Sequence, residues 1–254
     1  MDNLDIFICT HKDCNTIVNH PAYKLLYMGG HDDIALLNNR HELFFDHTGD
    51  SISHLNKFYC ELTGIYWVWK NYDVKDYVGF CHYRRYFQFL NDIPDISKED
   101  CDIILLRPLF IDKTLYEHYD MYHNIKDLDL VIDIMKEMYG IPDDICNTLS
   151  NTNLFYARNM FIMSKEMFNE YCEFMFNILF EFQKRCNIYT MNDVYKIIEN
   201  DPVYIKPAYH GKDFNWHLQH QARMGGFLAE RFMNIYSVWK NLKIKTYNCI
   251  QTEW

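Results

Sequence analysis

The tetrapeptide His82-Tyr83-Arg84-Arg85 combines the residue types best suited to binding an anion. It follows a short apolar run at 77–81 that predicts a central strand. Two adjacent arginines at a strand end cost desolvation free energy unless an anion or a carboxylate meets them. Guanidinium groups match phosphate oxygens, and His82 could add a donor or a titrating group. In the structural alternative, one arginine pairs with a core carboxylate such as Glu61 and the other is solvated.

A second set of candidates lies in the segment before that strand, where polar and aromatic residues mix. The polar members are Asn56, Glu61, Lys70 and Asn71, and the aromatic members are Tyr66, Trp67 and Trp69. In a helix, Tyr66, Trp69 and Lys70 lie close enough to share one face, and such rings can stack on a uracil or a sugar. Periodicity alone favours an ordinary core role for these rings.

Two Asp-x-Asp pairs, Asp100/Asp102 and Asp127/Asp129, have the spacing that can hold a divalent ion on a diphosphate. The first pair precedes its apolar strand instead of following it, and the second falls within a helical pattern. Both pairs are therefore interpreted as surface acids. Fixed positive charge from residues 82–85 could replace the metal.

The histidine pairs His118/His123 and His217/His220 lack companion ligands at zinc spacing and are interpreted as scattered histidines. A Walker loop, a Gly-x-Gly-x-x-Gly turn and a Gly-x-Ser-x-Gly elbow are all absent from the sequence. Common ATPases, dinucleotide enzymes and serine hydrolases are thereby excluded.

A late cluster at 223–232 places Gly225-Gly226 at the entrance of a predicted helix. Glycines let a backbone approach a ligand, and a helix start offers amide donors. Glu230 and Arg231 in the same cluster could equally form a structural ion pair, which their spacing favours.

Hydrophobic periodicity predicts an α/β fold with a mixed, mostly parallel central sheet flanked by helices. Strands are predicted at 4–10, 77–81, 103–106 and 160–163, with an edge strand at 242–247. Helices are predicted at 53–70 with Ser53 as N-cap, and at 113–123, 128–139, 165–185 and 223–240. Segment 28–50 is interpreted as a long loop that could include one hairpin, and 186–220 as an irregular excursion. Since ligands collect outside the carboxyl ends of strands, residues 82–85 are expected at the ligand-binding edge.

The composition fits a protein with a full hydrophobic core. The 254 residues are 49% hydrophobic, and 25 basic against 35 acidic residues give a net charge of −10, which argues against a nucleic-acid binder. Nine cysteines without a Cys-x-x-Cys pair are expected to be reduced core thiols of a cytoplasmic protein. We find no secretion signal and no apolar stretch of bilayer length in the sequence. Lys240, Lys243 and Lys245 could contact an anionic membrane peripherally, or could protect an edge strand, which is the more ordinary explanation.

Five ordered motifs give the chain a family resemblance. They are Ser51-Ile52-Ser53-x-Leu55-Asn56, the segment from Glu61 to Asn71 with Tyr66-Trp67-x-Trp69-Lys70, the segment Tyr77-Val78-Gly79-Phe80-x-His82-Tyr83-Arg84-Arg85-Tyr86-Phe87, Asn159-Met160-Phe161-Ile162-Met163, and Gly226-Phe227-Leu228-Ala229-Glu230-Arg231. Together they resemble a capsular polysaccharide and O-antigen biosynthesis family. That family was long described as a domain of unknown function and is now grouped with glycosyltransferases of galactofuranosyltransferase type.

The resemblance implies a single GT-A-like domain at 1–254, with a donor nucleotide-binding half at 1–110 and an acceptor half at 111–254. It implies a nucleotide-sugar donor, such as a UDP-sugar, and a glycan or lipid-linked glycan acceptor. UDP-galactofuranose is a donor known in the family, in which donor choice is expected to vary among members. It also implies an inverting hexosyl transfer. The stretch 186–220 is longer than the usual connection in the family, so the acceptor remains open.

Site residues are assigned on the residues and on the resemblance together. Donor-binding candidates are Thr10, His11, Lys12, Asn56, Glu61, Trp69, Lys70, Asn71, His82, Tyr83, Arg84 and Arg85. Acceptor-side candidates are His123, Asn159 and Arg231. Asp127 and Glu230 are the candidate bases, because each lies in a polar patch beside an apolar helix.

The expected reaction is a direct displacement in which an acceptor hydroxyl attacks the anomeric carbon while UDP leaves. No metal cofactor is expected, although manganese or magnesium stays compatible with the sequence. A nucleotide-sugar hydrolase or phosphotransferase and a non-catalytic glycan-binding protein are the alternatives.

Overall fold

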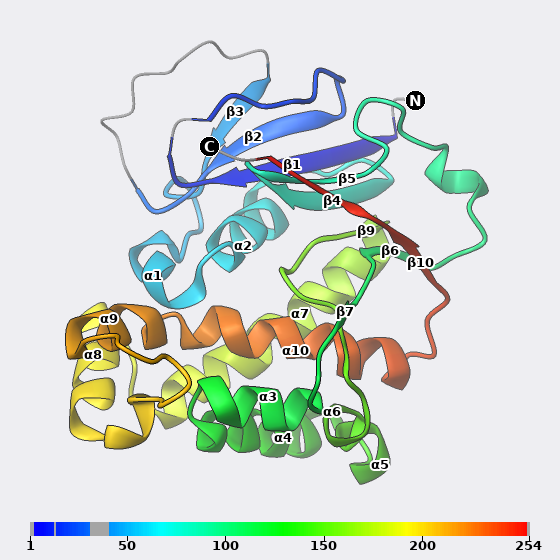
Figure 1. Ribbon diagram of the computed structural model, residues 1–254. Helices are drawn as coiled ribbons and strands as arrows, with labels where there is room; N and C mark the ends of the chain where they lie inside the picture. Colours follow the sequence, from blue (N-terminus) through cyan, green and yellow to red (C-terminus); the bar gives the residue numbers. More distant parts are fainter. Residues whose placement is uncertain (1–2, 13, 31–40, 253–254) are drawn as a thin grey trace.

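A mixed β-sheet runs across the molecule, with the helices gathered below it (Figure 1). The computed structural model describes residues 3–12, 14–30 and 41–252. Within these residues the main strands lie in the order β10-β6-β9-β4-β1-β2-β3. They are β1 (Leu4–Thr10), β2 (Tyr23–Tyr27), β3 (Glu42–Phe45), β4 (Tyr77–His82), β6 (Ile103–Leu106), β9 (Phe161–Ser164) and β10 (Ile244–Tyr247). The short strands β5 (Arg85–Phe87) and β11 (Cys249–Gln251) are attached beside β4.

The expected mixed, mostly parallel sheet is confirmed. Strands β4, β1, β2 and β3 pair in parallel, as do β10 and β6. Only β9 runs against its neighbours β4 and β6 in this series. Gly79 on β4 permits this pairing, since a Cβ there would lie 2.6 Å from the Ile162 side chain.

The sheet is buried on both faces because its strands are apolar on both faces. On β1, Phe7 and Cys9 pack into the core shared with the helices, whereas Ile6 and Ile8 pack into a second core on the other face. The second core is covered by the loop segments 14–22 and 88–101, which include the 3₁₀ turn η2 (Ile96–Lys98).

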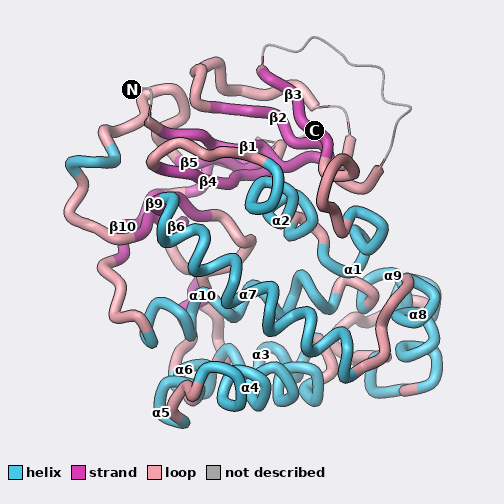
Figure 2. Tube along the Cα trace, turned by 180° about the vertical axis from the view of Figure 1, so that it is seen from behind, coloured by secondary structure: helices cyan, strands magenta, loops and turns pink. Residues whose placement is uncertain are grey.

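The helices form a thick layer on one side of the sheet, as the rear view also shows (Figure 2). They are α1 (Asn56–Tyr59), α2 (Leu62–Asn71), α3 (Leu115–Tyr122), α4 (Ile125–Tyr139), α5 (Asp143–Cys146), α6 (Thr148–Asn151), α7 (Lys165–Arg185), α8 (Met191–Asn200), α9 (Phe214–Gln221) and α10 (Met224–Trp239). Helix α7 lies between the sheet and the lower helices and contacts α2, α4 and α10. A small ribbon of β7 (Leu109–Phe110) and β8 (Leu154–Phe155) joins the two layers.

Three predictions on elements are corrected. The helix predicted at 53–70 is divided into the 3₁₀ turn η1 (Ser53–Leu55), α1 and α2, because Cys60 adopts a left-handed φ of 55°. Ser53 is not an N-cap, since its hydroxyl donates to the buried Asp46 carboxylate at 2.7 Å. The excursion at 186–220 contains α8, the turn η3 (Pro202–Tyr204) and α9.

The polar segment 28–50 contributes a strand to the sheet. Its strand β3 pairs in parallel with β2, and parallel pairing is incompatible with a hairpin between them. Residues 31–40 of this segment, which include the polar His31, Asp32 and Asp33, lie outside the described residues. The described helices include none with the length and apolar character needed to cross a bilayer.

Candidate functional site

A cavity of about 510 Å³ lies at the carboxyl ends of β1 and β4, where open α/β sheets bind ligands. Its volume suits a ligand of cofactor size. Its lining comes from β1, the α1–α2 junction, the end of β4, the loop before β9, and helices α9 and α10. The lining residues are Cys9, His11, Met28, Asn56, Lys57, Cys60, Glu61, His82, Tyr83, Arg84, Arg85, Arg158, Gln219, Arg223 and Glu230.

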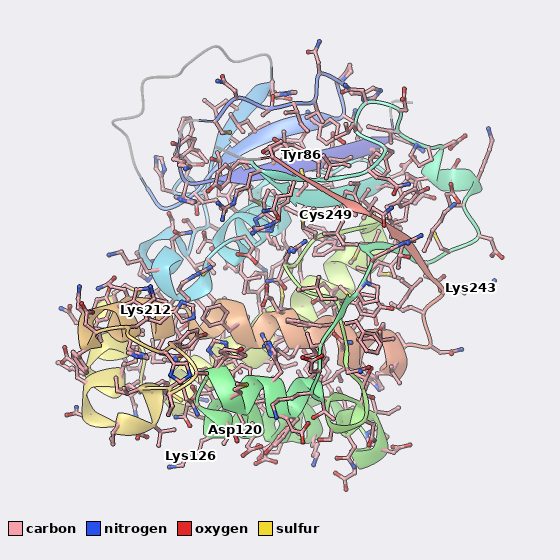
Figure 3. The ribbon with its side chains drawn as sticks, viewed as in Figure 1. Tyr86, Asp120, Lys126, Lys212, Lys243 and Cys249 are labelled. Carbon is pink, nitrogen blue, oxygen red and sulfur yellow. The ribbon has the colours of Figure 1, made fainter. Side chains whose placement is uncertain are left out.

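The tetrapeptide at 82–85 forms a tight hairpin between β4 and β5, in which His82 pairs with Arg85. Tyr83 is buried at the turn, and the Tyr86 hydroxyl donates to its carbonyl at 2.8 Å. Strand β11 pairs with β5 and braces the hairpin from the other side, so that Tyr86 and Cys249 lie near each other (Figure 3). The hairpin therefore holds its two arginines on a rigid base at the cavity.

The arginines of the cavity are not neutralised by protein carboxylates. Among the residues that the structure describes, none of Arg84, Arg85, Arg158 and Arg223 forms an ion pair. The Nε atoms of Arg84 and Arg85 are buried without a hydrogen-bond partner. Burial lowers the pKa of Arg85, and the neighbouring Arg158 and Arg84 lower it further. The alternative in which an arginine pairs with Glu61 is therefore wrong, and the arrangement can accept an anion.

Two carboxylates, Glu61 and Glu230, line the same cavity. Glu61 accepts a hydrogen bond from the Asn159 amide at 2.8 Å, and Glu230 accepts one from the Arg158 backbone N–H at 2.8 Å. Burial raises the pKa of Glu230, and the nearby Glu61 also raises it, while Arg231 acts in the opposite direction. A partly desolvated carboxyl of this kind can serve as a general base.

His82 is held in one orientation by the Arg158 carbonyl, to which its Nε2 atom lies at 2.8 Å. Burial lowers the pKa of the imidazole. Because the Arg158 carbonyl can only accept, the neutral His82 ring donates to it through Nε2–H. The Nδ1 atom of His82 is then an acceptor.

The predicted first nucleotide loop borders the cavity. Thr10 is buried at the end of β1, and its hydroxyl donates to the Lys12 carbonyl at 2.5 Å. His11 lines the cavity with its ring edge-on to Tyr83 at 5.4 Å, and the Lys12 ammonium lies 5.3 Å from the same ring. Asn56 lines the cavity too, but its amide donates to the Cys60 carbonyl and the Thr63 hydroxyl and so supports the break between α1 and α2.

The structure does not bring Trp69, Lys70 and Asn71 to the cavity. They lie at the far end of α2, roughly 12–15 Å along the helix axis from Glu61. The Trp69 ring stacks on Phe176 with centroids 5.8 Å apart, and the Lys70 ammonium lies 3.3 Å from the centroid of the Trp69 ring. The Asn71 side chain bonds the backbone of Asp50 and donates to the Trp67 carbonyl within α2, so all three have structural contacts.

Two of the three acceptor-side candidates, Arg231 on α10 and His123 at the end of α3, lie outside the cavity lining. Arg231 is 1% exposed, donates to the Phe227 carbonyl at 2.7 Å and lies 3.4 Å from Glu230, as the structural ion-pair interpretation predicted. His123 is buried, with Nδ1 at 3.1 Å from the Gln221 side chain. The third candidate, Asn159, donates a hydrogen bond to the lining residue Glu61.

Asp127 is buried on α4, and both of its carboxylate oxygens lie 3.0 Å from the Tyr204 hydroxyl. Its interpretation as a surface acid is wrong, although Asp100 and Asp102 are exposed and bond Lys243. Burial raises the pKa of Asp127 to about 7. Within the described residues, no group of three or more histidine, cysteine or acidic side chains could hold a metal ion.

The paired glycines serve helix packing and not ligand approach. A Cβ on Gly225 would lie 2.7 Å from the Phe58 ring, and one on Gly226 would lie 3.1 Å from the Cys60 sulfur. Helix α10 therefore packs tightly on α1, which brings Glu230 and Glu61 to one cavity.

The sequence interpretation missed Lys57, Arg158, Gln219 and Arg223 as lining residues. Arg223 is the first residue of the late cluster at 223–232, and Arg158 immediately precedes the motif that starts at Asn159. A basic residue beside a motif was therefore the signal that could have identified these two as lining residues. Gln219 lies in a segment that was interpreted as irregular, and nothing in its local pattern singles it out.

Two comparisons with known proteins give a match, one to a family model and one to a solved structure. Residues 5–198 match the family model described as "Domain of unknown function (DUF4422)". The apo structure of WbbM, described as a bifunctional glycosyltransferase, is similar over 100% of this chain, with a TM-score of 0.75 and 26% sequence identity. The match covers 46% of that structure, so this chain spans about half of its length. No curated protein matches the chain in a sequence search.

Proposed function

Because the chain belongs to the DUF4422 family and is similar in structure to a bifunctional glycosyltransferase, we propose that it is a glycosyltransferase. It takes a nucleotide-sugar donor and transfers a hexose to a glycan or lipid-linked glycan acceptor in surface polysaccharide biosynthesis. The donor is a UDP-sugar, with UDP-galactofuranose as the leading candidate, and the transfer inverts the anomeric carbon.

The single observation that supports this proposal most strongly is the pair Arg84 and Arg85 at the cavity, with no ion-pair partner among the described residues. Arg84 and Arg85 are fixed by the hairpin with buried Nε atoms that lack partners. A diphosphate supplies the charge and the acceptor oxygens that these atoms require. The adjoining loop at 10–12 is then available for the nucleoside.

The reaction is a displacement at the anomeric carbon. An acceptor hydroxyl oxygen forms the new bond to this carbon, while the bond from the carbon to the β-phosphate oxygen breaks and its electron pair stays on the departing diphosphate. Arg84 and Arg85 stabilise the developing charge. Glu230 accepts the hydroxyl proton, since of the two candidate bases it lines the cavity, whereas Asp127 is engaged by Tyr204 outside the cavity lining.

A panel of UDP-sugars tests the proposal. The protein is incubated with each donor, with and without short glycan acceptors, and UDP release and product mass are measured. We expect UDP release to depend on the acceptor and the product to gain one hexose. Equal UDP release without acceptor indicates a hydrolase, and absence of both UDP binding and release across the panel contradicts the proposal.

A further inference from the structure

Arg158 and Asn159, which Met160 separates from β9, form a turn with an uncommon backbone. Their φ angles are 79° and 48°, so two consecutive non-glycine residues occupy the left-handed region. This region is sparsely populated by residues with a Cβ, asparagine being more tolerant than arginine. Consecutive residues of this kind persist where the surrounding structure fixes them, and they cluster at functional sites.

This turn contacts three cavity side chains from three different elements. The Arg158 N–H donates to Glu230 on α10, and the Arg158 carbonyl accepts from His82 at the end of β4. The Asn159 amide donates to Glu61 at the α1–α2 junction. All three distances are 2.8 Å.

The turn is attached to a rigid part of the molecule. Strand β9 begins at Phe161, one residue after the turn, and lies between β4 and β6 in the sheet. Asn159 is buried, and Met160 packs into the second core. Movement of the turn would therefore displace all three side chains relative to the arginine hairpin.

We propose that the Arg158–Asn159 turn is a positioning element that sets Glu230, Glu61 and His82 against the reacting sugar. This inference rests on the proposed function for its catalytic meaning. The backbone of Arg158 does the positioning of Glu230 and His82, whereas its guanidinium adds charge to the cavity. The left-handed backbone is what points the Arg158 N–H and carbonyl at two different cavity residues.

The charged groups around Glu230 define what its titration reports. Arg231 follows it on α10, Glu61 faces it from the α1–α2 junction, and Arg223 faces it from the start of α10. Cys60 also lies near, with its thiol pKa raised by burial to about 11. The N–H of Arg158 stabilises the charged form of Glu230. Losing this donor alone should raise the pKa of Glu230.

A matched pair of variants separates the backbone from the side chain. Arg158→Gly removes the guanidinium but adopts a φ of 79° readily, whereas Arg158→Val removes the same charge and disfavours that backbone. The titration of Glu230 is followed by ¹³C NMR, with Glu230→Gln assigning the resonance. We expect the Gly variant to titrate like the wild type and the Val variant to titrate at higher pH. We also expect kcat of the Val variant to be about 10²-fold below that of the Gly variant. The acidic limb of its pH profile of kcat should lie at higher pH than in the Gly variant.

Asn159→Gly gives a second test that does not depend on the Val variant folding. It keeps the left-handed backbone and removes only the donor to Glu61. We expect kcat to fall by about 10-fold, from loss of one hydrogen bond to a charged group, while UDP affinity changes by less than about threefold. Wild-type kcat in this variant overturns the role of Asn159.

The proposal is overturned if the Gly and Val variants at 158 are both folded by thermal unfolding and have the same Glu230 titration and the same kcat. The NMR titration needs no substrate. If the wild-type protein transfers no sugar from any donor, the proposed function fails, and the titration still decides whether the turn positions Glu230.

Discussion

Arg84 and Arg85 each keep a buried Nε atom without a hydrogen-bond partner. Leaving buried donors unpaired is costly, and for a charged group the cost is greater than for a neutral one. The hairpin nevertheless holds both guanidinium groups at the cavity through pairing with β4 and β11. This arrangement is expected where the missing partner is a ligand anion.

Changing Arg84→Ala should therefore abolish transfer and weaken UDP binding while the protein stays folded. Loss of a hydrogen bond to a charged group should raise the Kd for UDP by about 10- to 100-fold. Titration calorimetry with UDP measures this change. Arg107→Ala is the matched control, because it removes the same charge from an exposed residue outside the cavity lining. Unchanged UDP affinity in the Arg84 variant would show that the diphosphate assignment is wrong.

Glu230→Gln should separate proton transfer from binding. The amide keeps the size of the side chain and an oxygen for the Arg158 N–H, but it cannot accept a proton. We expect kcat to fall by about 10² to 10⁴-fold with UDP affinity retained. Since burial raises the pKa of Glu230, the wild-type rate should decline on acidification from a pH above the ordinary glutamate value. A rate near that of the wild type would remove Glu230 as the base.

At the scale of elements, the Asp127–Tyr204 hydrogen bond ties η3, and with it the α8–α9 segment, to the start of α4. The folded pKa of Asp127 is about 7, above the value of about 3.9 expected in the unfolded chain. The unfolded chain therefore ionises first as pH rises, and this carboxyl makes folding less favourable between those values. Above pH 7 both states are ionised and the loss is complete.

Asp127→Asn should remove this pH dependence. Between pH 5 and pH 7 the free energy of unfolding of the wild type should fall by at most about 3 kcal/mol, at about 1.4 kcal/mol per pH unit. The variant should not show this fall. Urea unfolding at pH 5 and pH 8 measures the free energy of unfolding of both proteins. The wild type should lose stability relative to Asp127→Asn as the pH rises. A constant difference would contradict the buried carboxyl as its source. Sugar transfer should survive in Asp127→Asn, in contrast to Glu230→Gln.

Elements with a strong local pattern were predictable from the sequence. The 21-residue helix α7 follows its apolar periodicity over 165–185, and β1 follows its uninterrupted apolar run. The break at Cys60 was not predictable, because periodicity continues through it. It depends on a local side-chain contact, the Asn56 amide on the Cys60 carbonyl, and on a tertiary contact, the close approach of Gly226 to the Cys60 side chain.

The candidate site was predictable where a motif coincides with a strand end. Residues 82–85 follow an apolar strand, so two adjacent arginines at that place indicated the cavity edge before the fold was known. Arg158 lies before a strand and not after one, so its place beside a family motif was the only signal for it. Its role depends on a backbone angle that the residue type disfavours. Trp69 shows the reverse error, because a family motif includes it while its ring packs on Phe176 away from the cavity.

Across the whole molecule, charge is distributed unevenly. The chain carries a net charge of −10, yet the cavity lining contains Lys57 and four arginines against Glu61 and Glu230. A basic cleft in an acidic protein attracts an anionic ligand locally without favouring polyanions in general. Lys240, Lys243 and Lys245 do not add to this positive surface, since each pairs with an acid, Glu170, Asp100 and Glu99 respectively. Figure 3 shows Lys243 on the side of the molecule opposite Lys212, and none of these three lysines is a lining residue of the cavity.

This charge distribution leads to the prediction that transfer is independent of a divalent metal. Neither Asp-x-Asp pair contributes a lining residue to the cavity. Asp100 and Asp102 bond Lys243, Asp127 is buried against Tyr204, and Asp129 accepts from the Tyr116 hydroxyl. Fixed guanidinium charge can stabilise a departing diphosphate without a metal, which makes the four cavity arginines sufficient for this role. Initial rates should be equal, within about twofold or roughly 0.4 kcal/mol, in EDTA and in manganese or magnesium. Arg84→Ala serves as the comparison, because its loss of activity should not be restored by manganese. Complete loss of wild-type activity in chelator, with recovery on adding manganese, would show that the arginines do not replace the metal.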